Sequence, residues 1–418
     1  MVRRVLSSLI ISGALVACGG SDPGPNPGDP GNGGPGTPEP GECRETVAGE
    51  ISTFTTWTNG PEDCDYYVTG DAERAFVLVT SRLQIEPGTV VVFADDVMFV
   101  VDYGGSIRAV GTDDAPVVLT GETETHGSWY GVCFGQNAES RLEHVRLSWA
   151  GRVYDGTNSC RTAIGGLYRV AHAPVNIRDT VVTGSLTNGL NGHGLNFGEF
   201  GNNTFAGNEG FGVVLAARDA GKLDKASDLS GAGAGEVNGQ PYVYIGDDIV
   251  DARAHVLPNL SAPYYIGEGP TPFFSAVFVR GEASLDIEAG TEIVMGPGGG
   301  LHVYEGGVLN AVGTPGQRIT FRGLVDEPGA WDSIVLSDAG PSRISHADIS
   351  WGGADEDTYN GLLHVRGTRN ADAIIELDNL ILRGSETCGI DLGRHWEPDN
   401  VRMSDITFID VEPYDVCD

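Results

Sequence analysis

Two segments of this chain, 202 positions apart, carry nearly the same sequence. Residues 140–151 read SRLEHVRLSWAG and residues 342–353 read SRISHADISWGG. The same spacing relates IEPGT (85–89) to IEAGT (287–291) and GGSIRAVGT (104–112) to GGVLNAVGT (306–314). Because the offset is constant, no net insertion separates these copies. A long internal repeat of this kind indicates a fold built from similar units placed one after another.

The repeated units consist of short strand-like runs. FVLVTSRLQI, TVVVFADD and PVVLTG are rich in β-branched residues and end at Gly, Asp, Asn or Pro. Helical periodicity is scarce, and we expect a short helix only near 217–228. A shorter echo relates RDTVVTG (178–184) to NNTFAGN (202–208). We therefore predict an all-β chain, a right-handed parallel β-helix (solenoid) of stacked coils, with Gly, Asn or Asp at bends that need left-handed backbone angles.

The repeat also divides the chain. We expect two tandem homologous modules, residues 43–215 and 263–418, joined by a connecting segment (216–262) that either continues the solenoid or leaves it. Residues 18–42 are almost free of apolar side chains, and their Pro/Gly-rich sequence predicts a disordered tether. Residues 1–17 combine two arginines with a short apolar run, which is typical of a signal peptide.

The signal peptide ends in Leu15-Val16-Ala17-Cys18, which closely resembles the bacterial lipobox. That resemblance implies a lipid attached to Cys18 and cleavage just before it. Buried acyl chains contribute about 0.8 kcal/mol per methylene and would hold the protein on a membrane. Gly19 follows the cysteine, and by resemblance to the sorting rule of Gram-negative lipoproteins we expect the outer membrane, on its periplasmic or cell-surface face.

Six further cysteines suggest three disulfides in an exported chain, with fifteen connectivities open. They fall in sequence as three local pairs, each closing a loop of about 20–30 residues that would add about 3 kcal/mol of stability. The candidates are Cys43, Cys64, Cys133, Cys160, Cys388 and Cys417.

The chain has 25 Lys and Arg against 58 Asp and Glu, a formal net charge of −33. Such a surface repels nucleic acid and anionic headgroups, so we expect no nucleic-acid partner and membrane contact only through the lipid anchor. Neutral or cationic ligands are compatible with this charge.

IEPGTVVVF, GGSIRAVGTDDAPVVLTG, WYGVCF and SRLEHVRLSWAG together resemble bacterial β-helix repeat lipoproteins of the pectate-lyase-like superfold. The resemblance covers most of 65–215 and 263–418. It implies a fold but no activity, because that scaffold serves lyases, hydrolases, adhesins and passive surface proteins alike.

The repeated stretch contains a Ser/His pair, which is typical of some hydrolases. No G-x-S-x-G elbow surrounds either serine, and duplication fits packing better, with the histidines at bends and three apolar residues facing inward in each copy. The matched residues are Arg141, His144, Ser148 and Trp149 in the first copy and Arg343, His346, Ser350 and Trp351 in the second. The inward sets are Leu142, Val145 and Leu147, then Ile344, Ala347 and Ile349.

Three other patterns suggest ligands less strongly. Gly192-His193-Gly194 matches a polygalacturonase motif, but the carboxylates that precede it in that family are missing. Tyr66, Tyr67, Tyr264 and Tyr265 are candidates for exposed rings that stack on sugars, or for caps on the core. The pairs Asp95-Asp96, Asp113-Asp114 and Asp247-Asp248 leave calcium open as a cofactor, although solvated turns explain them better.

We therefore predict no catalytic residues, no metal site and no cofactor beyond that calcium. The expected function is a non-catalytic binding or structural role at the cell envelope, with polysaccharide binding or adhesion as its form. The alternative is a carbohydrate-active enzyme, a polysaccharide lyase or glycoside hydrolase, whose site the sequence does not reveal.

Overall fold

The computed structural model describes residues 43–71, 75–153, 160–167, 173–269, 275–354, 361–368, 374–393 and 400–417. These residues belong to one compact unit, Thr37–Asp418. The predicted signal peptide, Cys18 and the tether lie outside the described residues. In the part of the chain that is described, no helix is both long and apolar enough to span a bilayer.

The first set of strands, β1–β20, forms three parallel sheets in which each strand pairs with the strand three places later. The first sheet contains β1 (Glu45–Val47), β4 (Tyr66–Val68), β7 (Val90–Phe93), β10 (Val117–Gly121), β13 (Val145–Ser148), β16 (Val181–Thr183) and β19 (Thr204–Ala206). The second contains β2 (Glu50–Ile51), β5 (Phe76–Val79), β8 (Met98–Val101), β11 (Gly131–Phe134), β14 (Thr162–Gly166), β17 (Asn188–Asn191) and β20 (Phe211–Ala216). The third contains β3 (Thr55–Trp57), β6 (Arg82–Ile85), β9 (Ser106–Val110), β12 (Ser140–Glu143), β15 (Val175–Arg178) and β18 (Phe197–Gly201).

A short 3-10 helix, η2 (Ala217–Lys222), follows β20 and lies inside the region where a short helix was predicted. The second set of strands, β21–β36, comes after it. Its first members are β21 (Gln240–Ile249), β22 (Ala254–Leu257), β23 (Tyr264–Ile266), β24 (Ala276–Arg280), β25 (Ser284–Ile287), β26 (Glu292–Met295), β27 (Gly300–Tyr304) and β28 (Val308–Val312). The remainder are β29 (Ile319–Gly323), β30 (Ile334–Ala339), β31 (Ser342–Ser350), β32 (Leu363–Thr368), β33 (Ile375–Ser385), β34 (Cys388–Asp391), β35 (Val401–Val411) and β36 (Tyr414–Cys417).

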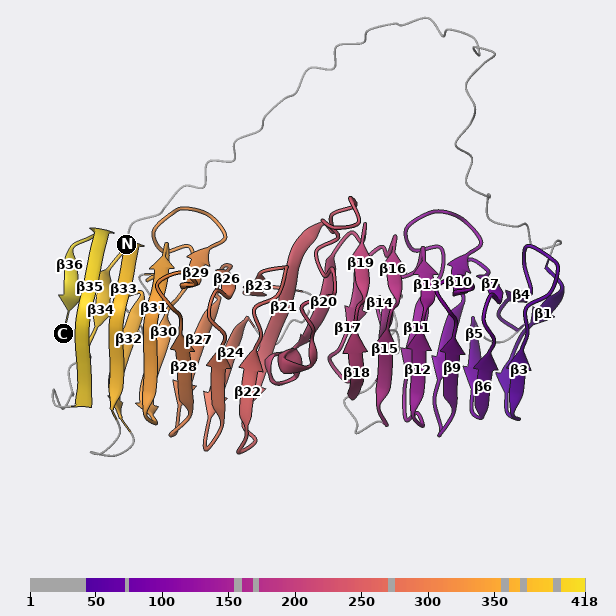
Figure 1. Cartoon of the computed structure of the whole chain (residues 1–418), viewed down its shortest axis with the longest axis horizontal. Helices are drawn as coiled ribbons and strands as arrows, with labels where there is room; N and C mark the ends of the chain where they lie inside the picture. The colour runs from indigo at the N-terminus through magenta and orange to yellow at the C-terminus, as the bar shows by residue number, and fades with distance from the viewer. Residues whose placement is uncertain are drawn as a thin grey trace, which may run out of the picture. The chain divides into compact units, whose positions relative to one another are not determined.

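The described chain is thus almost entirely β-structure, and the named strands pair in parallel, as predicted. Figure 1 shows successive strands side by side, from indigo β3 to yellow β35. The second set repeats the first at the spacing of the sequence repeat: β6, β7 and β10 correspond to β25, β26 and β29. The long strand β31 corresponds to β12 and β13 together.

The strands of the second set do not continue the sheets of their counterparts in the first set. β20 pairs with β21, and β21 pairs with β23, which is the counterpart of β4 rather than of β5. The sheet that contains β20 therefore continues through β23, β26 and β29. As a result, strands of different origin in the repeat meet on one continuous surface.

The bends carry the residues that left-handed backbone angles require. Asp179 and Asn202 have φ of 49° and 54°, and their counterparts Asn379 and Asp405 have 53° and 52°. His144 and His346, predicted to lie at bends, have φ of 48° and 49°. Asn, Asp and His are the non-glycine residues most often found in this region. The repeat therefore preserves backbone geometry even where it changes the side chain.

The interior is a continuous apolar column. All six predicted inward residues of the duplicated stretch are buried. Trp129 and Trp331 are among the largest buried side chains, and each indole Nε1 donates to a backbone carbonyl, that of Ser148 or Ser350, at 2.9 Å. The two tryptophans thus fill space and satisfy a carbonyl at equivalent turns.

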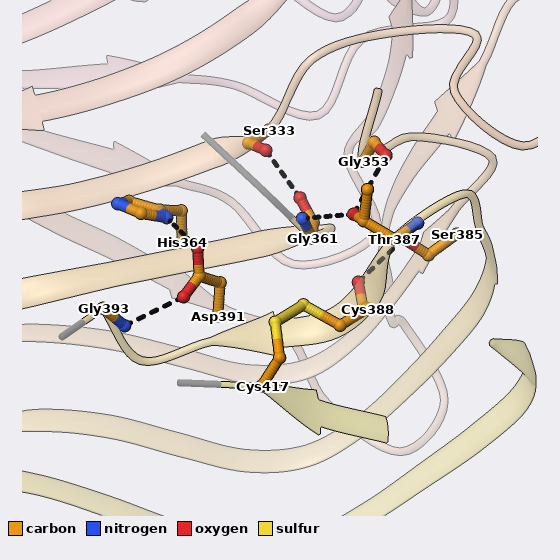
Figure 2. Close-up of a disulfide and its surroundings, with 10 residues drawn as sticks. All are labelled: Ser333, Gly353, Gly361, His364, Ser385, Thr387, Cys388, Asp391, Gly393 and Cys417. Carbon is orange, nitrogen blue, oxygen red and sulfur yellow. Dashed lines mark hydrogen bonds and ion pairs between the residues drawn. A yellow bond between two sulfur atoms is a disulfide. The ribbon is translucent and has the colours of Figure 1, made fainter. Parts of the chain in front are cut away.

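The three disulfides join cysteines that are neighbours in sequence, Cys43–Cys64, Cys133–Cys160 and Cys388–Cys417, which is one of the fifteen connectivities left open by the sequence. The last joins β34 to β36 at the end of the described chain, as Figure 2 shows. Each bridge links neighbouring parts of the stack, which limits opening of successive layers.

Replacing Trp331 by alanine is expected to lower the free energy of unfolding by about 3–5 kcal/mol, because it leaves a cavity and an unsatisfied carbonyl at Ser350. Denaturant unfolding followed by circular dichroism measures the loss. Phe54, whose side chain is 61% exposed, provides the control: Phe54→Ala should change stability by less than about 0.5 kcal/mol. Equal unfolding midpoints for both variants would contradict the stacked-core interpretation.

Candidate functional site

An aromatic cluster lies on the outer surface of the continuous sheet. Strand register places Val214, Tyr244, Tyr265 and Val294 next to one another on β20, β21, β23 and β26. With Phe211 they form an apolar cluster separate from the interior column. Since β20 belongs to the first strand set and β23 to the second, the cluster crosses the junction between the two sets.

Beside this cluster lies a cavity of about 750 Å³, within the usual range of about 300–1,000 Å³ for ligand sites. Its lining mixes aromatic, amide and charged side chains. The polar members are Arg161, Thr187, Asn188, Asn191, Glu209, Gln240 and Glu268, and Phe211, Leu186 and Tyr265 are among the apolar ones.

Several of these polar groups are held in place by the backbone. Asn188 Oδ1 accepts the N–H of Phe211 at 2.9 Å, and Asn191 Oδ1 accepts the N–H of His193 at 3.0 Å. The carboxylate of Glu209 pairs with His126 Nδ1 at 2.8 Å. The cavity therefore has a fixed polar wall as well as the exposed and adaptable side chain of Gln240.

The disulfide Cys133–Cys160 and the turn after β23 form the rest of the wall. Cys133 lies on the outer face of β11, and its partner Cys160 lines the cavity. After β23 the chain passes close over Tyr244, since a Cβ on Gly269 would meet that ring at 2.1 Å. Tyr265 donates its hydroxyl to Glu268 O at 3.1 Å, and burial raises its pKa above the usual value. The phenol therefore stays neutral and serves as a fixed apolar and hydrogen-bonding surface.

The equivalent outer face of the second strand set carries a buried polar row. Register aligns Phe278, His302, Val335, His364 and Asp391 on β24, β27, β30, β32 and β34. Figure 2 shows His364 directed at Asp391, with Nδ1 2.8 Å from the carboxylate. His302 Nδ1 lies 2.9 Å from the Tyr304 hydroxyl. Both histidines are more than nine-tenths buried, so this row is a structural element.

The histidines of the duplicated stretch have different neighbours in the two copies. In the first copy Ser148 Oγ donates to Thr120 Oγ1 at 2.8 Å, whereas His144 faces carboxylates. In the second copy His346 Nδ1 lies 3.0 Å from Ser345 Oγ, but Ser345 is 1% exposed. A buried serine of this kind is out of reach of a substrate.

The other predicted ligand residues are separated from one another. His193 lies in the turn after β17. Asp95 accepts the hydroxyl of Ser128 at 2.6 Å, and Asp96 pairs with Arg152. Asp247 Oδ2 lies 3.3 Å from Arg218 Nη1. Asp248 Oδ1 lies 3.9 Å from Arg280 Nη2. These two acidic pairs thus have protein partners of their own.

The expectation that four tyrosines are exposed is wrong for three of them. Tyr66, Tyr264 and Tyr265 are 4%, 0% and 5% exposed, and Tyr264 belongs to the interior column. Only Tyr67 is partly accessible among the four, and its hydroxyl donates to Glu122 at 2.9 Å. Doublets of aromatic residues on a strand point to opposite faces, and for Tyr264 and Tyr265 both faces are covered.

Sequence reasoning named only Tyr265 and Cys160 among the cavity residues, since the lining comes from at least six separate segments and no motif joins them. Comparison of the chain with protein-family models, curated proteins and solved structures finds no match. The cavity, with its fixed polar wall and aromatic edge, is the candidate functional site.

The buried row predicts a pH dependence of stability. Burial, then the charge of Arg280, lowers the pKa of His302 to about 4. Between about pH 6.5 and 4 the unfolded chain binds a proton that the folded His302 does not, so stability falls as the pH falls, by up to about 1.4 kcal/mol per pH unit. We expect the free energy of unfolding, measured with urea at pH 4.5–7.5, to depend less steeply on pH in His302→Val. Valine is chosen because it is the residue at the equivalent position of the first strand set, Val100.

The control for that comparison is His126→Gln, which changes a partly exposed imidazole. The carboxylates that contribute to acid unfolding are the same in the unaltered protein and in both variants. Only the difference between the proteins in how steeply stability changes with pH is therefore informative. Identical slopes for His302→Val and the unaltered protein would contradict the assignment of this window to His302.

Proposed function

We propose that this protein is a lipid-anchored, right-handed parallel β-helix of two tandem modules that binds an extended polysaccharide without catalysis at the outer membrane. The anchor is Cys18, the tether is residues 18–42, and the modules are residues 43–215 and 263–418. Strands β21 and β22 lie in the connecting segment, residues 216–262. Strands pair in parallel with strands that come two or three places later in the chain, and this pairing supports the coil arrangement. The recurrence of strands and bends at one spacing supports the duplication.

The observation that carries the binding proposal is the cavity beside Tyr265 and Phe211. Sugar rings present apolar faces and a rim of hydroxyls, and the cavity offers aromatic edges beside amides and carboxylates. Parallel strands place equivalent positions about 4.8 Å apart along the sheet, so a chain molecule lying across them meets a regular series of side chains.

The charge of the protein narrows the ligand. With a net charge of −33 and two glutamates in the cavity wall, an anionic polymer would be repelled. A neutral polysaccharide, or a cationic one that contains amino sugars, fits both the whole surface and the site.

The second candidate is a carbohydrate-active enzyme, and one observation favours it. Glu209, Glu268 and Arg161 line the same cavity, and paired carboxylates are the usual groups of glycoside hydrolysis. Glu209 is already paired with His126, so its role in this alternative would be that of a base or an orienting group.

The double variant Arg161→Asn, Gln240→Ala should weaken polysaccharide binding at least fivefold, because both residues line the cavity and neither contributes to the interior column. Asparagine is chosen at 161 since the backbone there has φ of 46°. Affinity electrophoresis of the full chain through gels that contain neutral, amino-sugar or anionic polymers measures the change.

Gln317→Ala, an exposed glutamine at a distant turn, is the control and should bind like the unaltered protein. Failure of the full chain to bind any neutral or cationic polymer would leave the binding proposal without support. Release of reducing ends or unsaturated uronate from a polymer would instead establish the enzyme alternative.

The anchor is tested separately. Labelled palmitate should be incorporated into the full chain in bacterial cells, and Cys18→Ser should abolish it, because the thiol accepts the lipid. Cys160→Ser provides the control, since that cysteine is bridged to Cys133 and should not affect labelling. Incorporation that persists in Cys18→Ser would refute the anchor at this position.

A further inference from the structure

Three ligand-type side chains meet at a bend of the first strand set. Each of them offers one ligand atom, and these three atoms lie within 4.8 Å of one another; the residues are Glu143, His144 and Asp179. Glu143 ends β12, and His144 and Asp179 are the bend residues that follow β12 and β15. Since β12 and β15 are neighbours in the sheet, the three groups come from two successive layers of the stack.

Neighbouring side chains orient this cluster. Asp113 Oδ1 lies 3.0 Å from His144 Nδ1, which leaves the other ring nitrogen, Nε2, facing Asp179 Oδ2 at 3.9 Å. Asn202 Nδ2 donates to Asp179 Oδ1 at 2.6 Å. A carboxylate on the far nitrogen of a histidine and a donor on a ligating carboxylate are the usual outer partners of a metal site.

The distance from Nε2 to Oδ2 is too long for a hydrogen bond and suits two ligands of one ion. With metal–ligand distances of about 2.0–2.2 Å, two donors of a tetrahedral ion lie about 3.4 Å apart. The distance between His144 Nε2 and Asp179 Oδ2 would therefore shorten by about 0.5 Å on binding. Glu143 also lies 3.6 Å from the guanidinium of Arg141, a partly exposed pair that costs little to break.

The equivalent bend of the second strand set has other charges, and the carboxylate beside its histidine is Asp378, whose Oδ2 accepts the hydroxyl of Ser345 at 3.2 Å. His346 keeps the bend, but Ser345, Asn379 and Pro315 replace the acids at 143, 179 and 113. A protein cation occupies the corner there, since Arg318 donates to Asn379 Oδ1 at 3.0 Å and to its carbonyl at 2.9 Å. The counterpart of Arg318 in the first set is the uncharged Pro116.

The first bend thus lacks this guanidinium and carries three carboxylates around the histidine that both bends share. We propose that Glu143, His144 and Asp179 bind a divalent cation of the zinc type, with Asp113 and Asn202 as orienting partners. One imidazole and two carboxylates suit Zn²⁺, whereas Ca²⁺ and Mg²⁺ prefer all-oxygen sites. The bound ion would join two successive layers, and its remaining coordination position would face solvent because all three residues are partly exposed.

The test uses the full chain, purified in detergent without a histidine tag and freed of metal. Titration calorimetry with Zn²⁺ should show one site of micromolar affinity, and Zn²⁺ should raise the unfolding temperature. His144→Asn should weaken binding at least tenfold and remove the temperature rise, with asparagine chosen because it accepts the left-handed angle. Asp179→Asn, which introduces the residue found at 379, should have the same effect.

His346→Asn is the matched control and should leave the affinity unchanged within twofold. Excess Ca²⁺ should not displace the Zn²⁺. The proposal is overturned by an affinity no tighter than millimolar, by equal losses in His144→Asn and His346→Asn, or by Ca²⁺ that competes at equal concentration. Circular dichroism of each variant separates loss of the site from loss of folding, and if His144→Asn is unfolded, Asp179→Asn alone decides.

Discussion

The structure depends on parallel backbone pairing between successive layers. Each strand donates and accepts hydrogen bonds on both sides, so the chain must return to the same register after every layer. That return fixes which side chains face inward and places a bend at a set position. Bends such as His144 and Asp179 then need left-handed backbone angles, which favour Asn, Asp, His or Gly, although Trp149, Trp351 and Arg161 adopt such angles as well. The interior and the bends are thus determined together.

This constraint leaves the outer face free to vary, and variation there produces the candidate site. The outer position of one sheet is valine at 214, tyrosine at 244 and 265, and valine at 294. Because β23 of the second strand set continues the sheet of β20, Tyr265 lies beside Phe211 of β20 and the two asparagines of β17, Asn188 and Asn191. The cavity forms where two differently derived surfaces meet, and neither strand set contains it alone.

The sequence was sufficient for features that follow from periodicity. The repeat predicted the inward residues and the bends at His144 and His346, whereas the cysteine pattern left the disulfide connectivity open. It was insufficient for Tyr264 and Tyr265, which were expected to be exposed, because a doublet of aromatics gives no information about what covers each face. The change of sheet between strand sets, and so the cavity, depends on how β21 pairs on both sides, and no local pattern encodes that choice.

The duplicated fold also gives an internal comparison that a single-copy protein lacks. Positions that serve the stack agree between the copies: Trp129 and Trp331 bond equivalent carbonyls, and Ser140 and Ser342 each accept an N–H from the preceding layer. Positions free of that role have diverged, as at Asp179 and Asn379 or Val100 and His302. Since Asp179 and Asn379 have nearly the same backbone angle, the difference in charge between these two bends is not required by the backbone conformation.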